Sequence, residues 1–236
     1  MIIDQLKTTL HNLANDEKAN IYTRFFKTGK GEYGEGDTFL GITVPLQRLV
    51  AKEYFNQVSL KEIGELLKVN IHEYRLTALL MLVSKFEKTK DFKQQKEMID
   101  FYLSNTQYIN NWDLVDTSCY KILGRYCYQH NQEQILYNLA KSDILWEKRM
   151  AIISTLYFIK QKSLAVTPEI VLMNMNHPHD LMHKANGWML REMGKIDDEK
   201  LIYFLDQYAT QLPRTSLRYA LEKLDPALKE YYMKLK

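Results

Sequence analysis

Apolar residues recur at intervals of three and four along most of the chain, which is the spacing of one face of an α-helix. Leu60–Leu67 and residues 74–83 show this spacing clearly. The same pattern continues in residues 92–103, 112–130, 132–139, 146–159, 168–175, 181–193, 197–208, 214–224 and 227–236. No convincing alternation with a period of two occurs, so the sequence predicts an all-α chain.

Brief polar connectors, such as residues 87–90, 141–143 and 194–198, separate these helices. They define antiparallel helix pairs at a spacing of roughly 35–45 residues, the range of HEAT and armadillo repeats. Stacked helix pairs form a curved solenoid with an extended concave face. We therefore predict one HEAT-like (armadillo-type) helical-repeat domain over residues 1–236, which can be stable as a monomer.

Composition fits a soluble, reduced, cytoplasmic protein. The chain has 236 residues, 46% hydrophobic and 26% charged, which is ordinary for a globular domain. The N-terminus does not resemble a signal peptide, and no apolar run is long enough to span a membrane, so no membrane partner is expected. Cys119 and Cys127 would lie about 12 Å apart along one helix, too far for a disulfide.

Basic side chains recur in successive predicted helix pairs, although the net charge is only +3. Lys184, Trp188 and Arg191 follow one another at helical spacing and share a face. The other candidate DNA-binding cations are Arg24, Lys27, Lys148, Arg149, Arg214 and Arg218. In a solenoid they would make the concave face basic, which fits a phosphate backbone. Solvated charges on unrelated helix faces are the alternative.

Two further patterns are set aside. Residues 29–34, Gly-Lys-Gly-Glu-Tyr-Gly, match the dinucleotide glycine pattern, but they follow a helical segment rather than a strand, so no nucleotide cofactor is expected. His177, His179 and His183 are close in sequence, but ordinary turn and first-turn positions explain them better than a metal site. We therefore expect neither a metal nor a cofactor.

Residues 110–116, Asn-Asn-Trp-Asp-Leu-Val-Asp, open a predicted helix and contain the most informative pair in the chain. Trp112 and Asp116 are four residues apart and share one face. An indole face attracts a cation, and a carboxylate stabilises developing positive charge. The pair suits chemistry on a group that is, or becomes, cationic. A core tryptophan at an ordinary helix start is the alternative interpretation.

The chain resembles the AlkD-type alkylpurine DNA glycosylases, a HEAT-like-repeat family of DNA alkylation repair enzymes, over almost its whole length. The Trp-Asp-Leu-Val-Asp string at 112–116 and the Lys-Ala-Asn-Gly-Trp-Met-Leu-Arg-Glu string at 184–192 carry most of this resemblance. Further matches are Phe39-Leu40-Gly41-Ile42 with Pro45 and Arg48, and Trp146 with Arg149-Met150-Ala151-Ile152.

The resemblance implies a base excision repair enzyme, a hydrolase that removes cationic N3- or N7-alkylated purines from double-stranded DNA. It implies Asp116 as the catalytic carboxylate and Arg149 as a contact to the DNA backbone. It also implies Trp112 and Trp188 as the indoles that line the cleft. Asp113 is the rival carboxylate, but it lies about 100° around the helix from Trp112.

Elementary chemistry agrees with this function. An alkylated purine already carries positive charge and leaves without being protonated, so one carboxylate can stabilise the oxocarbenium-like sugar and position a water.

Two departures from the family motivate an alternative, a non-catalytic binder of damaged or branched DNA on the same scaffold. The glycine loop of residues 27–37 is long, and Phe25 or Phe26 stands where leaner members have a Tyr. A solenoid that binds another protein is a third interpretation.

Overall fold

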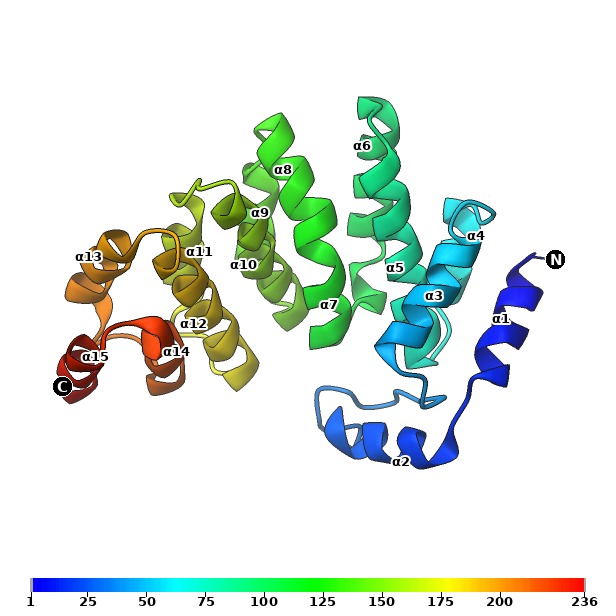
Figure 1. Cartoon of the computed structure of the whole chain (residues 1–236), viewed down its shortest axis with the longest axis horizontal. Helices are drawn as coiled ribbons and strands as arrows, with labels where there is room; N and C mark the ends of the chain where they lie inside the picture. The colour runs from blue at the N-terminus through cyan, green and yellow to red at the C-terminus, as the bar shows by residue number, and fades with distance from the viewer. Residues whose placement is uncertain (1, 236) are drawn as a thin grey trace. The chain divides into compact units, whose positions relative to one another are not determined.

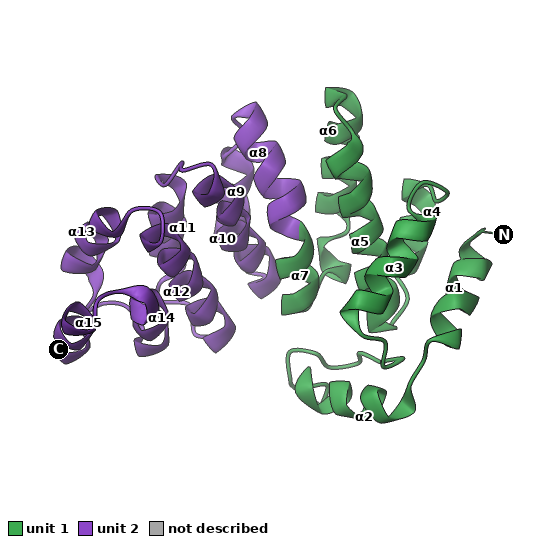
Figure 2. Cartoon of the chain, in the orientation of Figure 1, with its two compact units in different colours: residues 1–118 green, residues 119–236 purple. Residues whose placement is uncertain are grey.

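The computed structural model describes residues 2–235, and α-helices account for most of them (Figure 1). The described residues contain no β-strand, and one isolated parallel bridge joins Thr38 to Ile71. The all-α prediction is therefore confirmed. By its internal contacts the chain divides into two compact units, residues 1–118 and 119–236 (Figure 2).

The first unit contains α1 (Ile2–Asn12), α2 (Asp16–Phe25), α3 (Val44–Tyr54), α4 (Leu60–Leu67), α5 (His72–Lys88), α6 (Phe92–Ser104), the 3-10 turn η1 (Thr106–Tyr108) and most of α7 (Trp112–Cys119). The second contains the π-helical segment η2 (Tyr120–Gly124), α8 (Arg125–His130), α9 (Gln134–Lys141), α10 (Leu145–Lys160), α11 (Val166–Asn174), α12 (Asp180–Gly194), α13 (Asp198–Tyr208), α14 (Arg214–Ala220), the 3-10 turn η3 (Leu221–Lys223) and α15 (Pro226–Lys234).

The predicted helices are all found, with boundaries shifted by a few residues. Residues 112–130 are helical without interruption, as predicted, although η2 widens the turn between α7 and α8. The helices α1, α2 and α3 were not singled out by the apolar pattern. The last residue of the predicted C-terminal helix, position 236, lies outside the described residues.

The core of the first unit is built around α5. Every residue from His72 to Val83 is buried, so this helix is apolar around its circumference except in its first turn. A helix of this kind must be covered on several sides. The helices α3, α4 and α6 pack against it, and α4 joins this core through Ile63, Leu66 and Leu67.

The second unit is organised by α10 and α12. The π segment, α9, α11 and α12 pack against α10, while α13 and α14 pack against α12. Gly187 makes the α12–α14 contact possible, because a Cβ there would lie 2.4 Å from the Ser216 carbonyl oxygen. The glycine of the Lys-Ala-Asn-Gly-Trp string thus serves helix packing.

Two other features bear on the sequence predictions. Cys119 and Cys127 are both buried, and no disulfide joins them. Across residues 2–235 no helix is both long and apolar enough to cross a membrane.

Candidate functional site

Trp112 and Asp116 lie one turn apart near the start of α7. The helix begins directly after Asn111, whose side-chain oxygen accepts a hydrogen bond from the Trp112 N–H at 2.8 Å. Leu114 and Val115 are fully buried, whereas Trp112 and Asp116 are partly exposed. Leu114 and Val115 therefore hold this turn of α7 against the core, and the Trp112 indole and the Asp116 carboxylate are accessible from solvent.

The structure brings both predicted aromatic residues to Trp112. Phe26 stacks on the indole, with ring centroids 5.4 Å apart and planes inclined by 22°. Phe25 meets the indole edge-on at 5.9 Å and is 61% exposed, whereas Phe26 is only 8% exposed. Phe39 also stacks on Phe26, with ring centroids 5.2 Å apart. Phe26 is thus the centre of the cluster, and Phe25 is its solvent-facing member.

Behind this aromatic cluster, His72 bridges two carboxylates. Its Nδ1 lies 3.0 Å from Asp37 Oδ2 and its Nε2 lies 2.7 Å from Asp113 Oδ2. Burial acts to lower the pKa of His72, but the neighbouring Asp113 and Asp37 outweigh burial and raise that pKa to about 9. The ring is therefore an imidazolium at neutral pH. It also packs against Phe26 and Phe39, at 4.9 and 4.8 Å.

Arg75 completes the buried network. Its guanidinium donates to Asp37 Oδ1 and to Asn110 Oδ1, two residues before Trp112. Burial acts to raise the pKa of Asp37, but hydrogen bonds and charge from His72 and Arg75 overcome it and lower the pKa below its usual value. Two cations therefore balance two carboxylates in a space closed to solvent. The network joins α5, the loop after α2 and the start of α7.

This network settles how Asp113 is used. Its Oδ2 contacts His72, and its Oδ1 accepts a hydrogen bond from the Leu114 N–H at 2.8 Å. Asp113 is only 9% exposed, so both of its oxygens are committed inside the protein. Asp116 lies a turn later on α7 and is partly exposed.

The loop between α2 and α3 is fastened to the same end of α5. The buried Glu73 carboxylate accepts hydrogen bonds from the backbone N–H groups of Leu40, Gly41 and Ile42 at 2.9, 2.8 and 3.2 Å. Gly41 has φ +79°, and a Cβ there would lie 2.0 Å from the Asn15 carbonyl oxygen. Only glycine fits this position.

The glycine-rich part of that loop has no nucleotide-binding context. It follows α2, and the described residues hold no strand before it. The carboxylates of Glu32 and Glu35 accept hydrogen bonds from the N–H groups of Gly29 and Gly31 at 2.9 and 2.8 Å. Groups that would cradle a phosphate are thus occupied by acidic side chains of the loop itself.

The basic residues of the second unit are largely engaged within the protein. Arg149 is 4% exposed and its guanidinium donates to the Leu181 carbonyl oxygen at 2.5 Å. Lys148 Nζ donates to the Ala140 carbonyl oxygen at 3.0 Å, and Lys184 Nζ pairs with Asp180 at 2.7 Å. These contacts give Arg149 a structural role between α10 and α12, and its contact with DNA stays a prediction.

The remaining predicted site residues are more accessible. Trp188 is partly exposed and its indole N–H donates to Glu192 Oε1 at 3.1 Å. Arg191 pairs with Glu192 and Glu222. Arg214 is exposed and donates to the Met233 carbonyl oxygen at 2.8 Å. The other exposed cations of the predicted set are Arg24, Lys27 and Arg218.

The three clustered histidines occupy the turn positions that the sequence predicted. The His179 side chain caps α12 by accepting a hydrogen bond from the Leu181 N–H at 3.1 Å. His177 Nδ1 accepts from the His179 N–H, and His183 Nε2 contacts the His177 carbonyl oxygen. Within residues 2–235, no three His, Cys, Asp or Glu side chains are arranged to hold a metal ion.

Comparison with known proteins places the chain in a family. The family model described as DNA alkylation repair enzyme matches residues 6–224. The chain belongs to the DNA alkylation repair enzyme family. A solved structure described as a predicted DNA alkylation repair enzyme from Enterococcus faecalis is similar to it, with a TM-score of 0.71 and 16% identity over 90% of this chain and 97% of that chain. No curated protein matches the chain.

The predicted resemblance to DNA alkylation repair enzymes and the predicted helical-repeat fold are thus confirmed. In this chain, sequence reasoning found Trp112 and its aromatic neighbours but missed the network behind them. The signal was present in residues 72–75, His-Glu-Tyr-Arg, where charged residues lead directly into a fully apolar helix. Such residues are buried only when they are paired.

Proposed function

We propose that this chain is a DNA glycosylase, which hydrolyses the N-glycosidic bond of cationic N3- or N7-alkylated purines in duplex DNA. Membership in the DNA alkylation repair enzyme family supports a role in the repair of alkylated DNA. One observation supports the glycosylase activity in particular. The Asp113 carboxylate is hydrogen-bonded to His72 inside the protein, whereas Trp112 and Asp116 are both partly exposed on α7.

The chemistry requires one carboxylate. When the bond between C1′ and the purine nitrogen breaks, its electron pair goes to the alkylated base, which departs neutral. The sugar is left as an oxocarbenium-like cation, which Asp116 stabilises through its negative charge. A water molecule then attacks C1′ and passes a proton to Asp116. The departing base needs no proton from the enzyme, because it was cationic at the start.

The aromatic residues hold the cationic base and the sugar. The Trp112 indole offers its face to positive charge. Phe26 supports the indole from behind, and Phe25 extends the aromatic surface into solvent. We propose that the Trp188 indole also helps to hold the cationic base and the sugar. Phenylalanine at position 25 or 26 supplies a ring without the hydroxyl that leaner family members carry.

The predicted cations are proposed to bind the DNA backbone within one HEAT-like domain of residues 1–236. Arg24 and Lys27 are exposed close in sequence to Phe25, and Arg214 and Arg218 are exposed on α14. Lys148, Arg149, Lys184 and Arg191 would have to exchange protein partners for phosphates. Binding through these residues should weaken steeply as salt is added, since phosphate contacts release counterions.

Base release from duplex DNA containing N-methylpurines tests the proposal. Wild type should release the free base, and Asp116→Asn should lower release by at least about 100-fold while binding DNA normally. Asp100→Asn is the matched control, because Asp100 is an exposed carboxylate on α6 that pairs with Lys96. Release by Asp116→Asn at the wild-type rate would remove Asp116 from the mechanism.

Failure of wild type to release any base has two distinguishable meanings. Intact, salt-sensitive DNA binding would favour the non-catalytic binder, which the phenylalanine at the Tyr position also motivates. Absence of DNA binding at physiological salt would reject both DNA functions and favour a solenoid that binds another protein.

A further inference from the structure

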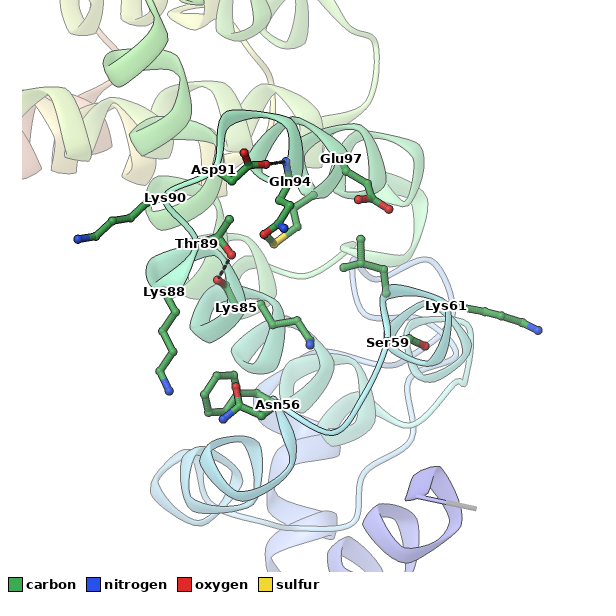
Figure 3. Close-up of a pocket in the computed structure, with 13 residues that line it drawn as sticks. Asn56, Ser59, Lys61, Lys85, Lys88, Thr89, Lys90, Asp91, Gln94 and Glu97 are labelled. Carbon is green, nitrogen blue, oxygen red and sulfur yellow. Dashed lines mark hydrogen bonds between the residues drawn. The ribbon is translucent and has the colours of Figure 1, made fainter.

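A separate polar cavity lies at the other end of α5 (Figure 3). Its volume is about 720 Å³, and it is formed by the connection between α3 and α4, the last turn of α5 and the first turns of α6. Lys85 in this cavity lies about 20 Å along the helix axis from His72 at 1.5 Å per residue. The cavity is therefore distinct from the aromatic cluster and its buried network.

Lysines dominate the charged lining of the cavity. The lysines are Lys61, Lys85, Lys88 and Lys90, and the acids are Asp91 and Glu97. Figure 3 shows that Lys85 extends into the space beside Ser59, whereas Lys61 and Lys90 extend away from it. The inner ammonium group is therefore that of Lys85, whereas Lys88 extends in a different direction, toward Asn56.

In the described residues, no carboxylate contacts the inner lysines directly. Within residues 2–235, neither Lys85 nor Lys88 forms an ion pair. The Glu62 carboxylate attracts Lys85, but its Oε2 accepts hydrogen bonds from the N–H and hydroxyl of Ser59 at 2.7 and 2.8 Å. Partial burial lowers the pKa of Lys85, so its charge is incompletely solvated. A bound anion would restore the missing interaction.

Asp91 does not supply that anion. Its Oδ1 accepts a hydrogen bond from the Gln94 N–H at 2.8 Å and caps α6. Lys88 Nζ instead lies 4.2 Å from the centre of the Phe55 ring. Besides the longer-range attraction of Glu62, the positive charge at the inner end of the cavity thus faces an aromatic ring and the C-terminal end of the α5 dipole.

The other residues that line the cavity indicate which kind of ligand it could bind. Phe55 and Met98 form an apolar wall, and both are buried apart from the surface that faces the cavity. Asn56 and Gln94 add amide groups that can hydrogen-bond a heterocycle or sugar. A second cavity of about 410 Å³ shares Phe55, Asn56 and Lys88 with the first. Volumes of roughly 300–1,000 Å³ are typical of small-molecule sites.

We propose that this cavity binds a small phosphorylated ligand of nucleotide size, with Lys85 and Lys88 holding the phosphate and Phe55 and Met98 lining its apolar part. The proposal is independent of the glycosylase function. A phosphomonoester carries close to two negative charges near neutral pH, which match the two ammonium groups.

Isothermal titration calorimetry on the full chain at low salt tests this site, with inorganic phosphate and a nucleoside monophosphate as probes. Wild type should bind both, and the nucleotide more tightly. Lys85→Met and Lys88→Met should each weaken binding by about 10-fold or more, since a charge-assisted contact is lost. Lys61→Met is the matched control, because that side chain points away from the cavity (Figure 3). It should bind as wild type does.

Three results would overturn the proposal. The first is an absence of binding of either probe to wild type. The second is equal affinity in wild type and in the Lys85→Met, Lys88→Met double variant. The third is full displacement of the nucleotide by undamaged duplex DNA, which would assign the cavity to a phosphate of the DNA backbone. Base release by Lys85→Met should equal that of wild type, which separates this site from the glycosylase proposal.

Discussion

The two ends of α5 use charge in opposite ways. In the first turn, His72, Glu73 and Arg75 are all buried, and each meets a partner: two carboxylates, three backbone N–H groups, and a carboxylate with a carboxamide. In the last turn, Lys85 and Lys88 face a cavity, and neither pairs with a carboxylate in residues 2–235. Buried, matched charges hold elements together, whereas unmatched charges at a cavity are available to a ligand.

This difference comes from the segments that surround each turn in the fold. The first turn lies beneath the loop after α2 and beside the start of α7, so it has polar neighbours from two other segments. The last turn lies beside the connection between α3 and α4, whose nearest carboxylate is used to cap α4. One helix therefore serves as an anchor at one end and as a cavity wall at the other.

The largest stability effect is expected for His72→Leu. This change leaves the buried carboxylates of Asp37 and Asp113 without their shared cation, which should lower the free energy of unfolding by about 3–5 kcal/mol. Urea denaturation followed by circular dichroism measures it. His11→Leu, at an exposed position on α1, is the control and should change stability by less than about 0.5 kcal/mol. Similar effects of the two changes would contradict the anchoring role of the network.

A pH dependence of stability is expected next. His72 has a pKa of about 9 in the folded chain and its ordinary value of 6.5 when unfolded, so between these values the folded state holds the extra proton. The contribution is complete below pH 6.5 and is lost as pH rises through about 9, in total about 3 kcal/mol. Denaturation at several pH values measures the slope, which should vanish in His72→Leu. An unchanged slope in that variant would assign the dependence to other groups.

A smaller effect is expected for Asp113→Asn. The amide keeps the shape of the side chain but removes the charge beside His72, so stability should fall by about 2 kcal/mol. The pKa of His72 should also fall, which an NMR titration of its ring protons reports. Asp116→Asn should instead leave the pKa of His72 unchanged while abolishing base release. A loss of base release in Asp113→Asn as large as in Asp116→Asn would break the distinction between the two carboxylates.

The smallest effect is expected for Lys85→Met. Because this lysine forms no ion pair in the described chain, its removal should change the free energy of unfolding by less than about 0.5 kcal/mol. Urea denaturation of the ligand-free protein measures it. A loss comparable to that of Asp113→Asn would show that the last turn of α5 is held by charge in the same way as the first.

Local periodicity was enough to predict most of the fold. The apolar spacing gave the helices from Leu60 onward, and the continuous helix of residues 112–130 was predicted across its π segment. The helical spacing of Asp113 and Asp116 from Trp112 also predicted that Asp113 lies away from the face of the helix that carries the indole. These inferences depend only on residues within one helix, where sequence spacing determines geometry.

Contacts between helices were beyond the same reasoning. His72 is separated by 35 positions from Asp37 and by 41 from Asp113, and no periodic pattern connects such residues. The partners of the basic residues were hidden for the same reason. Arg149 looks like a solvent-facing cation in the sequence, yet it is buried against the Leu181 carbonyl oxygen on another helix.

From its three hydrogen bonds, we expect the Glu73 carboxylate also to influence the order of events during folding. Residues 40–42 have no regular secondary structure, and their N–H groups depend on this one side chain, which is placed only when α5 has formed. We therefore expect the segment to become ordered late and to be the first part of the unit that a protease reaches. Phe26, whose carbonyl oxygen lies against Gly34 of the same loop, would be uncovered at that moment.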